Sequence, residues 1–158
     1  MALVQGAGNP GVYGGIYSAD GVTAQGTLGT TAALLSWNYA TAYDGLSSGG
    51  VTPDKANSKI TVANAGDYQI HFDISFSGTG NASFQFHLRV GGVEVAQGAV
   101  SRKLGAGGDI GNCGFTTYKT LAAGDVLTIY VETDNVANTD SGTMRDAHFN
   151  VTRVRDTG

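Results

Sequence analysis

The chain contains three histidines, and their spacing indicates whether they could bind a metal ion together. His71, His87 and His148 each fall within a segment that alternates polar and apolar residues, which predicts a strand for each of them. A zinc site built by one chain usually places two ligands a few residues apart, and no pair of histidines has that spacing. We therefore expect structural or exposed histidines, and any metal site would have to be shared between subunits.

An oxygen-rich segment, ETDNVANTDSG at 132–142, suggests a second kind of chemistry. Asp134, Asn135, Asn138 and Asp140 carry side-chain oxygens of the type that calcium prefers. Their spacing does not match the twelve-residue calcium loop, and Asn, Asp and Gly are ordinary residues of turns. The segment therefore predicts a turn, with calcium binding as the alternative that stays open.

The sequence lacks the common catalytic motifs. It has no nucleophile elbow and no Gly-rich phosphate loop ending in Lys-Ser/Thr, and GAGNPG at 6–11 neither follows a strand nor opens a helix. The acidic residues are scattered over predicted turns, whereas acid–base catalysis needs carboxylates placed together. Cys113 has no second cysteine to pair with, so we expect a small residue that is buried or half-buried. We expect no enzymatic activity, no metal and no cofactor.

The segments that carry these residues are predicted to be strands. Apolar and polar residues alternate through 68–76 and through 84–90, and the turn cluster SGTGN separates the two segments. Three more segments with strand character follow at 113–121, 125–132 and 147–154. Short strands about ten residues apart, with no convincing helix, predict an all-β antiparallel sandwich of the jelly-roll type.

The tripeptide AGD occurs twice, at 65–67 and at 123–125, each time at the start of a predicted strand. Glycine turns the chain without steric cost, and aspartate can accept hydrogen bonds from neighbouring backbone amides. We interpret both copies as turns and expect no catalytic role for Asp67 or Asp125.

Length and charge limit the classes of function. The chain has 158 residues, about the size of one domain. Nine Lys and Arg residues against 13 Asp and Glu residues give a net charge of −4, which offers no basic surface to nucleic acid. No apolar run approaches about 18 residues and no charged-then-apolar leader opens the chain, so we expect a soluble protein made in a cytoplasm, with no membrane contact.

The first 54 residues differ from the rest because they contain no Lys or Arg, and Asp20 is the only charged residue before Asp44. Disordered tails are usually charged, so this Gly-rich segment predicts an extended arm over residues 1–35 that lies on another protein surface. A mobile leader is the alternative. The expected anchors of the arm are Val12, Tyr13, Ile16, Tyr17 and Leu28.

Five segments, taken in order, carry a resemblance to a known family: SWNYATAYDG (36–45), SKITVANAGDYQIHFDISFSG (58–78), FQFHLRVGGVEVA (84–96), LAAGDVLTIYVETD (121–134) and AHFNVTRV (147–154). Over about three-quarters of the chain they resemble the C1q/TNF-like jelly-roll family, in the variety encoded by bacteriophages. ITVANAGDYQI is similar to the family's signature before its central strand, with Ala63 in place of the usual proline.

The resemblance implies a tight threefold trimer built by a jelly-roll domain of residues 36–158. The apolar strand faces would fill the core, with Tyr68, Ile70, Phe72, Ile74, Phe76, Phe84, Phe86, Leu88, Leu127, Ile129, Val131, Phe149 and Val151 buried. Interfaces are depleted in Lys and Glu and enriched in Tyr and Arg. From the polar strand faces we therefore expect a trimer interface that includes His71, Gln85, His87, Tyr118 and Tyr130; an ordinary solvated sheet face is the alternative.

Phage-type members with short arms suggest a structural protein of the virion. We expect a homotrimeric capsid decoration (cement) protein on the outer surface of the capsid, whose arms together clamp neighbouring copies of the major capsid protein. The alternative is the head module of a tail or head fibre that recognises a host-surface glycan or protein through loops 45–57, 101–112 and 132–146. The chain has neither a collagen-like nor a coiled-coil stalk, which disfavours this alternative.

Overall fold

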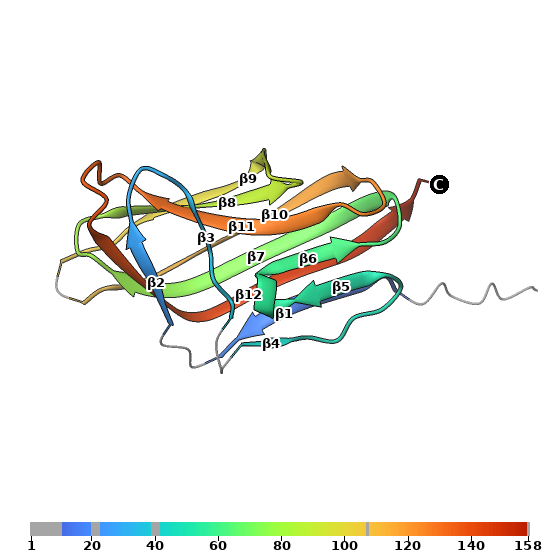
Figure 1. Ribbon diagram of the computed structural model, residues 1–158, viewed down its shortest axis with the longest axis horizontal. Coiled ribbons are helices and arrows are strands. Elements are labelled where there is room, and N and C mark those ends of the chain that lie inside the picture. Colours follow the sequence, from blue (N-terminus) through green and yellow to red (C-terminus); the bar gives the residue numbers. More distant parts are fainter. Residues whose placement is uncertain (1–10, 20–22, 39–41, 107, 158) are drawn as a thin grey trace, which may run out of the picture.

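The protein, described by a computed structural model over residues 11–19, 23–38, 42–106 and 108–157, is a sandwich of two antiparallel sheets (Figure 1). Sheet A contains β1 (Tyr13–Ser18), β2 (Thr23–Leu28), β4 (Ala42–Asp44), β7 (Gly66–Gly78), β10 (Ile110–Leu121) and β12 (Asp140–Asp156). Sheet B contains β3 (Ala33–Leu34), β5 (Val51–Asp54), β6 (Lys59–Val62), β8 (Ser83–Val90), β9 (Val93–Lys103) and β11 (Val126–Thr133).

The strand order places the longest strands at the centre of sheet A. The order is β10-β7-β12-β1-β4, with β2 also paired to β12, and sheet B has the order β5-β6-β11-β8-β9, with β3 paired to β11. Among the described residues the only helix is a 3-10 turn, Lys55–Asn57, and no helix there is long and apolar enough to cross a membrane. The predicted all-β architecture is confirmed.

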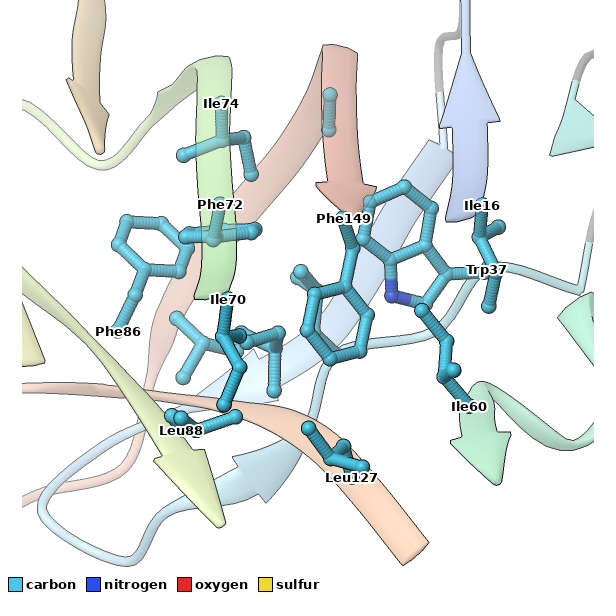
Figure 2. Packing of buried hydrophobic residues seen from close by; sticks show 14 of the residues in the cluster. Ile16, Trp37, Ile60, Ile70, Phe72, Ile74, Phe86, Leu88, Leu127 and Phe149 are labelled. Carbon is cyan, nitrogen blue, oxygen red and sulfur yellow. The ribbon is translucent and has the colours of Figure 1, made fainter. Parts of the chain in front are cut away.

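The core lies between the two sheets, as the period-two pattern predicts. Every residue expected in the core is buried. The Phe72 and Phe86 rings, one from each sheet, meet at a centroid distance of 5.7 Å, and Trp37 stacks on Phe149 at 6.5 Å (Figure 2). Burying each large apolar side chain contributes about 1.5–3 kcal/mol, so this cluster is the main source of the stability of the sandwich.

The segment predicted to be an extended arm is in large part a component of the sandwich. β1 pairs with β12 from Tyr13↔Thr152 to Ser18↔Ala147. The side chain of Ile16 is fully buried in the core of this same domain. The expectation of an arm over residues 1–35 is therefore corrected, because residues 11–19 and 23–35 belong to the folded domain; residues 1–10 lie outside the described residues.

Two more of the expected arm anchors lie in the core. Val12 is 6% exposed and Leu28 is 1% exposed, so neither can reach another protein. The prediction of arm anchors was wrong because an uncharged segment with apolar residues is as compatible with a buried strand as it is with a surface that contacts a partner. Gly14 and Gly15 interrupt the apolar–polar alternation of β1, which conceals the strand from a reading of the sequence.

The two AGD tripeptides have different structural roles. Gly124 has a φ of +90° and the Asp125 carboxylate accepts the backbone N–H of Ala122 at 2.9 Å, so the second copy is the expected turn. In the first copy, Asp67 lies inside β7 and accepts hydrogen bonds from Thr120 Oγ1 and Arg155 Nε, both at 2.6 Å. That carboxylate therefore links β7 to both of its neighbouring strands.

Candidate functional site

The outward face of sheet A presents three rows of residues that cross its strands. The rows are Tyr43–Tyr17–His148–Asp73–Gly114, Gly15–Asn150–His71–Thr116 and Tyr13–Thr152–Gln69–Tyr118. They lie opposite the core because the alternate residues of the same strands point inward, as Ile70, Phe72 and Phe149 do. We call the residues of these three rows the tyrosine face.

The tyrosine face is poor in charge and rich in exposed aromatic surface. Tyr118 is 64% exposed, Tyr43 is 52% exposed and Tyr13 is 39% exposed. None of its three rows contains Lys, Arg or Glu. Exposed tyrosine without Lys and Glu is the composition of a protein–protein interface rather than of an ordinary solvated surface.

A hydrogen-bond network holds the middle of the face in place. His71 Nδ1 lies 2.9 Å from Thr116 Oγ1, and His71 Nε2 lies 2.8 Å from Asp73 Oδ2. On the other side of the same carboxylate, His148 Nδ1 lies 3.0 Å from Asp73 Oδ1. The ring of Tyr17 packs against this network through an edge-to-face contact with His148, at a centroid distance of 5.4 Å. These side chains are therefore ordered before any partner arrives.

This arrangement fits binding better than catalysis. Thr116, His71 and Asp73 follow the order hydroxyl, imidazole and carboxylate that nucleophilic catalysis uses. They stand on the outer face of neighbouring strands, whereas acyl transfer also needs a water-excluded site with N–H donors aimed at an oxyanion. Polar groups that satisfy one another on a sheet face are instead preorganised for contact with a protein surface.

Two glycines let side chains of the face pack directly against the backbone. A Cβ atom on Gly15 would lie 2.1 Å from Asn150 Oδ1, and a Cβ atom on Gly45 would lie 2.0 Å from the ring of Tyr17. Beside them runs a groove of about 370 Å³, whose walls include Tyr13, Tyr17 and His71. The groove offers a place into which side chains of a partner can insert.

The five residues expected at a trimer interface do not form one patch. Tyr118 and His71 lie on the tyrosine face, whereas Gln85, His87 and Tyr130 lie on β8 and β11 of sheet B. Sequence reasoning could place each residue on the polar side of a strand but could not tell which sheet that strand joins.

His87 and Tyr130 already have partners within their own chain. His87 is 4% exposed, and its Nδ1 and Nε2 lie 3.1 Å from Glu94 Oε1 and 3.2 Å from Glu132 Oε1. The guanidinium of Arg89 covers the ring of Tyr130, 4.0 Å from its centroid. His87 is therefore enclosed between two carboxylates and has almost no surface left for a partner.

Sequence reasoning missed Tyr43 and Asn150, and it assigned Tyr13 and Tyr17 to an arm instead of a sheet. The signal for the tyrosines was present in YGGIY, where residues four apart on a strand face the same side. Tyr43 stacks on Tyr17 at 5.5 Å, so β4 and β1 extend the face beyond the strands that alternation predicts.

The described part of the chain contains one half-buried cysteine and no cluster of metal-binding side chains. Cys113 is half-buried, and burial raises the pKa of its thiol to about 11, so the unreactive protonated form dominates at neutral pH. Among the described residues, no group of three or more His, Cys, Asp and Glu side chains could hold a metal ion.

Comparison with known proteins supports the fold alone. No family model matches the sequence, and no curated protein matches it. The structure is similar to Eiger TNF from S. frugiperda, with a TM-score of 0.66 and 11% sequence identity over 94% of this chain and 96% of that one. It is also similar to murine APRIL, with a TM-score of 0.58 and 11% identity over 90% of this chain and 99% of that one. The predicted TNF-like jelly roll is confirmed.

Proposed function

We propose that this protein is a non-enzymatic structural protein that assembles as a homotrimer through the tyrosine face. The observation that carries the proposal is an ordered, charge-poor and tyrosine-rich face on a sheet whose other side fills the core. The threefold assembly implied by the resemblance to C1q/TNF-like jelly rolls supports it, as does the similarity of the fold to Eiger TNF. In a cyclic trimer one surface of each subunit meets a different surface of the next.

The mass of the protein in solution tests the assembly. Light scattering behind a sizing column should give a mass near three times 16.1 kDa. Thr152 is exposed within the face, so Thr152→Arg should leave the fold intact but bury an unpaired charge on assembly and give a monomer. Thr52→Arg, on an exposed position of sheet B, is the matched control and should stay trimeric. A wild-type mass near 16.1 kDa would contradict the proposal.

The cellular role that we propose for the trimer is decoration of a bacteriophage capsid on its outer surface, bound to the major capsid protein. Since residues 11–19 and 23–35 belong to the sandwich, the segment that we propose as the clamp is MALVQGAGNP, residues 1–10, which carries no charged side chain. Residue 11 lies at the end of the sandwich where Tyr13 pairs with Thr152, so three such segments would leave one rigid trimer together. Multivalency would then strengthen contacts that are weak individually.

Capsid binding tests this role separately from assembly. The intact trimer should co-sediment with empty capsids of the phage that encodes it, and a variant lacking residues 1–10 should remain trimeric but lose at least about tenfold in occupancy, as expected when linked contacts are removed. Unchanged occupancy of this variant would remove the clamp from the proposal while leaving the trimer in place.

The head module of a phage fibre is the second candidate. A groove of about 230 Å³ at one end of sheet B is lined by Phe84 and by polar side chains, among them Ser83, Gln85, Ser101, Glu132 and Asp134. Hydroxyl, amide and carboxylate groups of this kind bind sugar hydroxyls. A glycan-array signal that Glu132→Gln abolishes would favour this candidate over decoration.

A further inference from the structure

One carboxylate on the tyrosine face is shared by two histidine rings. Asp73 Oδ2 lies 2.8 Å from His71 Nε2, and Asp73 Oδ1 lies 3.0 Å from His148 Nδ1. The side chains of His71 and Asp73 are each 42% exposed and that of His148 is 47% exposed, so water reaches both rings in a free subunit. The trimer that we propose would cover all three side chains, because they form the middle of its interface.

The hydrogen bonds of this cluster are complete without an added proton. Neutral His71 can donate from Nε2 to Asp73 and accept at Nδ1 from the hydroxyl of Thr116, which is 2.9 Å away. Neutral His148 can donate from Nδ1 to the other carboxylate oxygen. With both rings neutral the cluster is an anion, a proton on one ring makes it neutral, and a proton on each ring makes it a cation.

The residues around the cluster do not offset a second proton. On β1, β4 and β10 they are tyrosines and a threonine, which ordinarily carry no charge between about pH 5 and pH 8: Tyr17, Tyr43, Tyr118 and Thr116. At a bulge of β12, Arg145 and Asp146 carry opposite charges and add no net charge to the margin of the face. At the far end of the strands, Asp67 and Arg155 pair with each other. The shared carboxylate and its two histidines therefore determine how the charge of the face changes in this pH range.

We propose that acid dissociates the trimer by placing a proton on each of the two histidines that share Asp73. This inference rests on the trimer interface proposed above. A free subunit can hold both protons because water solvates its rings, whereas the trimer would bury a cationic cluster without a second anion, which is unfavourable. Free subunits therefore bind more protons than the trimer does, so a falling pH favours dissociation. Histidine ordinarily changes its charge between about pH 5 and pH 8, which is the range where we expect release.

Light scattering of the full chain over a dilution series, from about pH 7.5 to about pH 5.5, tests the proposal. Carboxylates ordinarily keep their charge in this range, so histidine is the group that responds. If each subunit takes up one proton on release, the dissociation constant of the trimer into three subunits should rise about a thousandfold per pH unit at the acidic end. Circular dichroism at the same pH values should show that the released subunits remain folded.

Replacement of one ring should remove the response to acid. In His148→Gln a single imidazolium remains beside Asp73, so the trimer can bury a neutral pair and keep its proton. The dissociation constant of this variant should change less than about tenfold across the whole pH range, with the variant at pH 7.5 as its own reference. His71→Gln should behave in the same way. The matched control is His87→Gln, which should keep the wild-type response because His87 lies in sheet B, enclosed between two carboxylates of its own chain.

The possible outcomes separate this inference from the trimer itself. A wild type that stays trimeric at pH 5.5 with an unchanged dissociation constant would overturn the inference and leave the trimer in place. A wild-type response that persists in both His148→Gln and His71→Gln would also overturn it, because the protons would then bind elsewhere. Loss of the folded signal together with dissociation would identify acid unfolding instead of release. A monomeric wild type at pH 7.5 would contradict the proposed trimer, and this inference with it.

Discussion

At the scale of single residues, Gly15 determines how closely other atoms approach the tyrosine face. A Cβ atom there would lie 2.1 Å from Asn150 Oδ1 and 2.9 Å from the carbonyl oxygen of Phe149, which is backbone and cannot swing away. Gly15→Val should therefore lower the free energy of unfolding by about 1–3 kcal/mol, measured by urea denaturation. Gly11→Ala is the control, since its nearest neighbour, Tyr13 Cδ1, is 3.5 Å away. Equal midpoints for the two variants would show that the face deforms readily.

Asp67 provides a second prediction at the same scale. The hydroxyl of Thr120, followed by the guanidinium of Arg155, holds the pKa of this carboxyl below its ordinary value of 3.8. Because the folded-state pKa is depressed, the interaction contributes stability above pH 3.8 and loses it as the pH falls through the folded-state pKa. Thr120→Val should raise the pKa of Asp67, as followed by NMR titration.

The same titration contains its own reference. The backbone N–H of Ser83 holds the pKa of Asp134 low, and this contact is independent of Thr120. The pKa of Asp134 should therefore stay where it is in Thr120→Val. A variant in which the pKa of Asp67 also stays unchanged would show that the Arg155 ion pair alone is sufficient.

At the scale of elements, the apolar–polar pattern predicts a strand only where large apolar side chains alternate with polar ones. β7 and β8 alternate large apolar with polar residues, so their existence and their inward faces follow from the sequence. β1 places Gly14, Gly15 and Ile16 in a row, and no pattern distinguishes it from an uncharged arm. Its strand character comes from pairing with β12, a contact between residues far apart in the chain.

The candidate site was predictable only in part, for a related reason. Alternation correctly placed His71 and Tyr118 on polar strand faces, and it did the same for His87 and Tyr130. Which strands share a sheet depends on long-range pairing, which a local pattern does not contain. The structure therefore divides these four residues between two sheets, whereas the sequence treats them as one group.

Truncation distinguishes the two interpretations of the N-terminal segment, an extended arm and a strand of the sandwich. Removing residues 1–10 should leave the Tm unchanged. Removing residues 1–18 deletes β1, which exposes a long edge of β12 and uncovers the core around Ile16, so this variant should unfold at a Tm at least about 10 °C lower or aggregate. Circular dichroism melting measures both. Similar melting of the two truncated proteins would restore the extended-arm interpretation.

At the scale of the whole molecule, the distribution of charge distinguishes a trimer held together by ion pairs from one held together by burial of tyrosine rings. Each chain carries a net charge of −4, so three chains repel one another at long range. The tyrosine face contributes no Lys, Arg or Glu to an ion pair across the interface, and Asp73 is already bound to His71 and His148. In the proposed trimer, assembly would then come from burial of tyrosine rings and from shape complementarity, which salt does not weaken.

The trimer should therefore resist salt. Raising NaCl from about 0.1 M to about 1 M shortens the screening length from about 10 Å to about 3 Å, which reduces repulsion between chains and leaves ring burial intact. Light scattering over a dilution series should give a dissociation constant that stays constant or falls. Thr152→Arg, expected to be monomeric, provides the monomer mass at each salt concentration. Dissociation of the wild type in 1 M NaCl would mean that ion pairs outside the tyrosine face hold the subunits together.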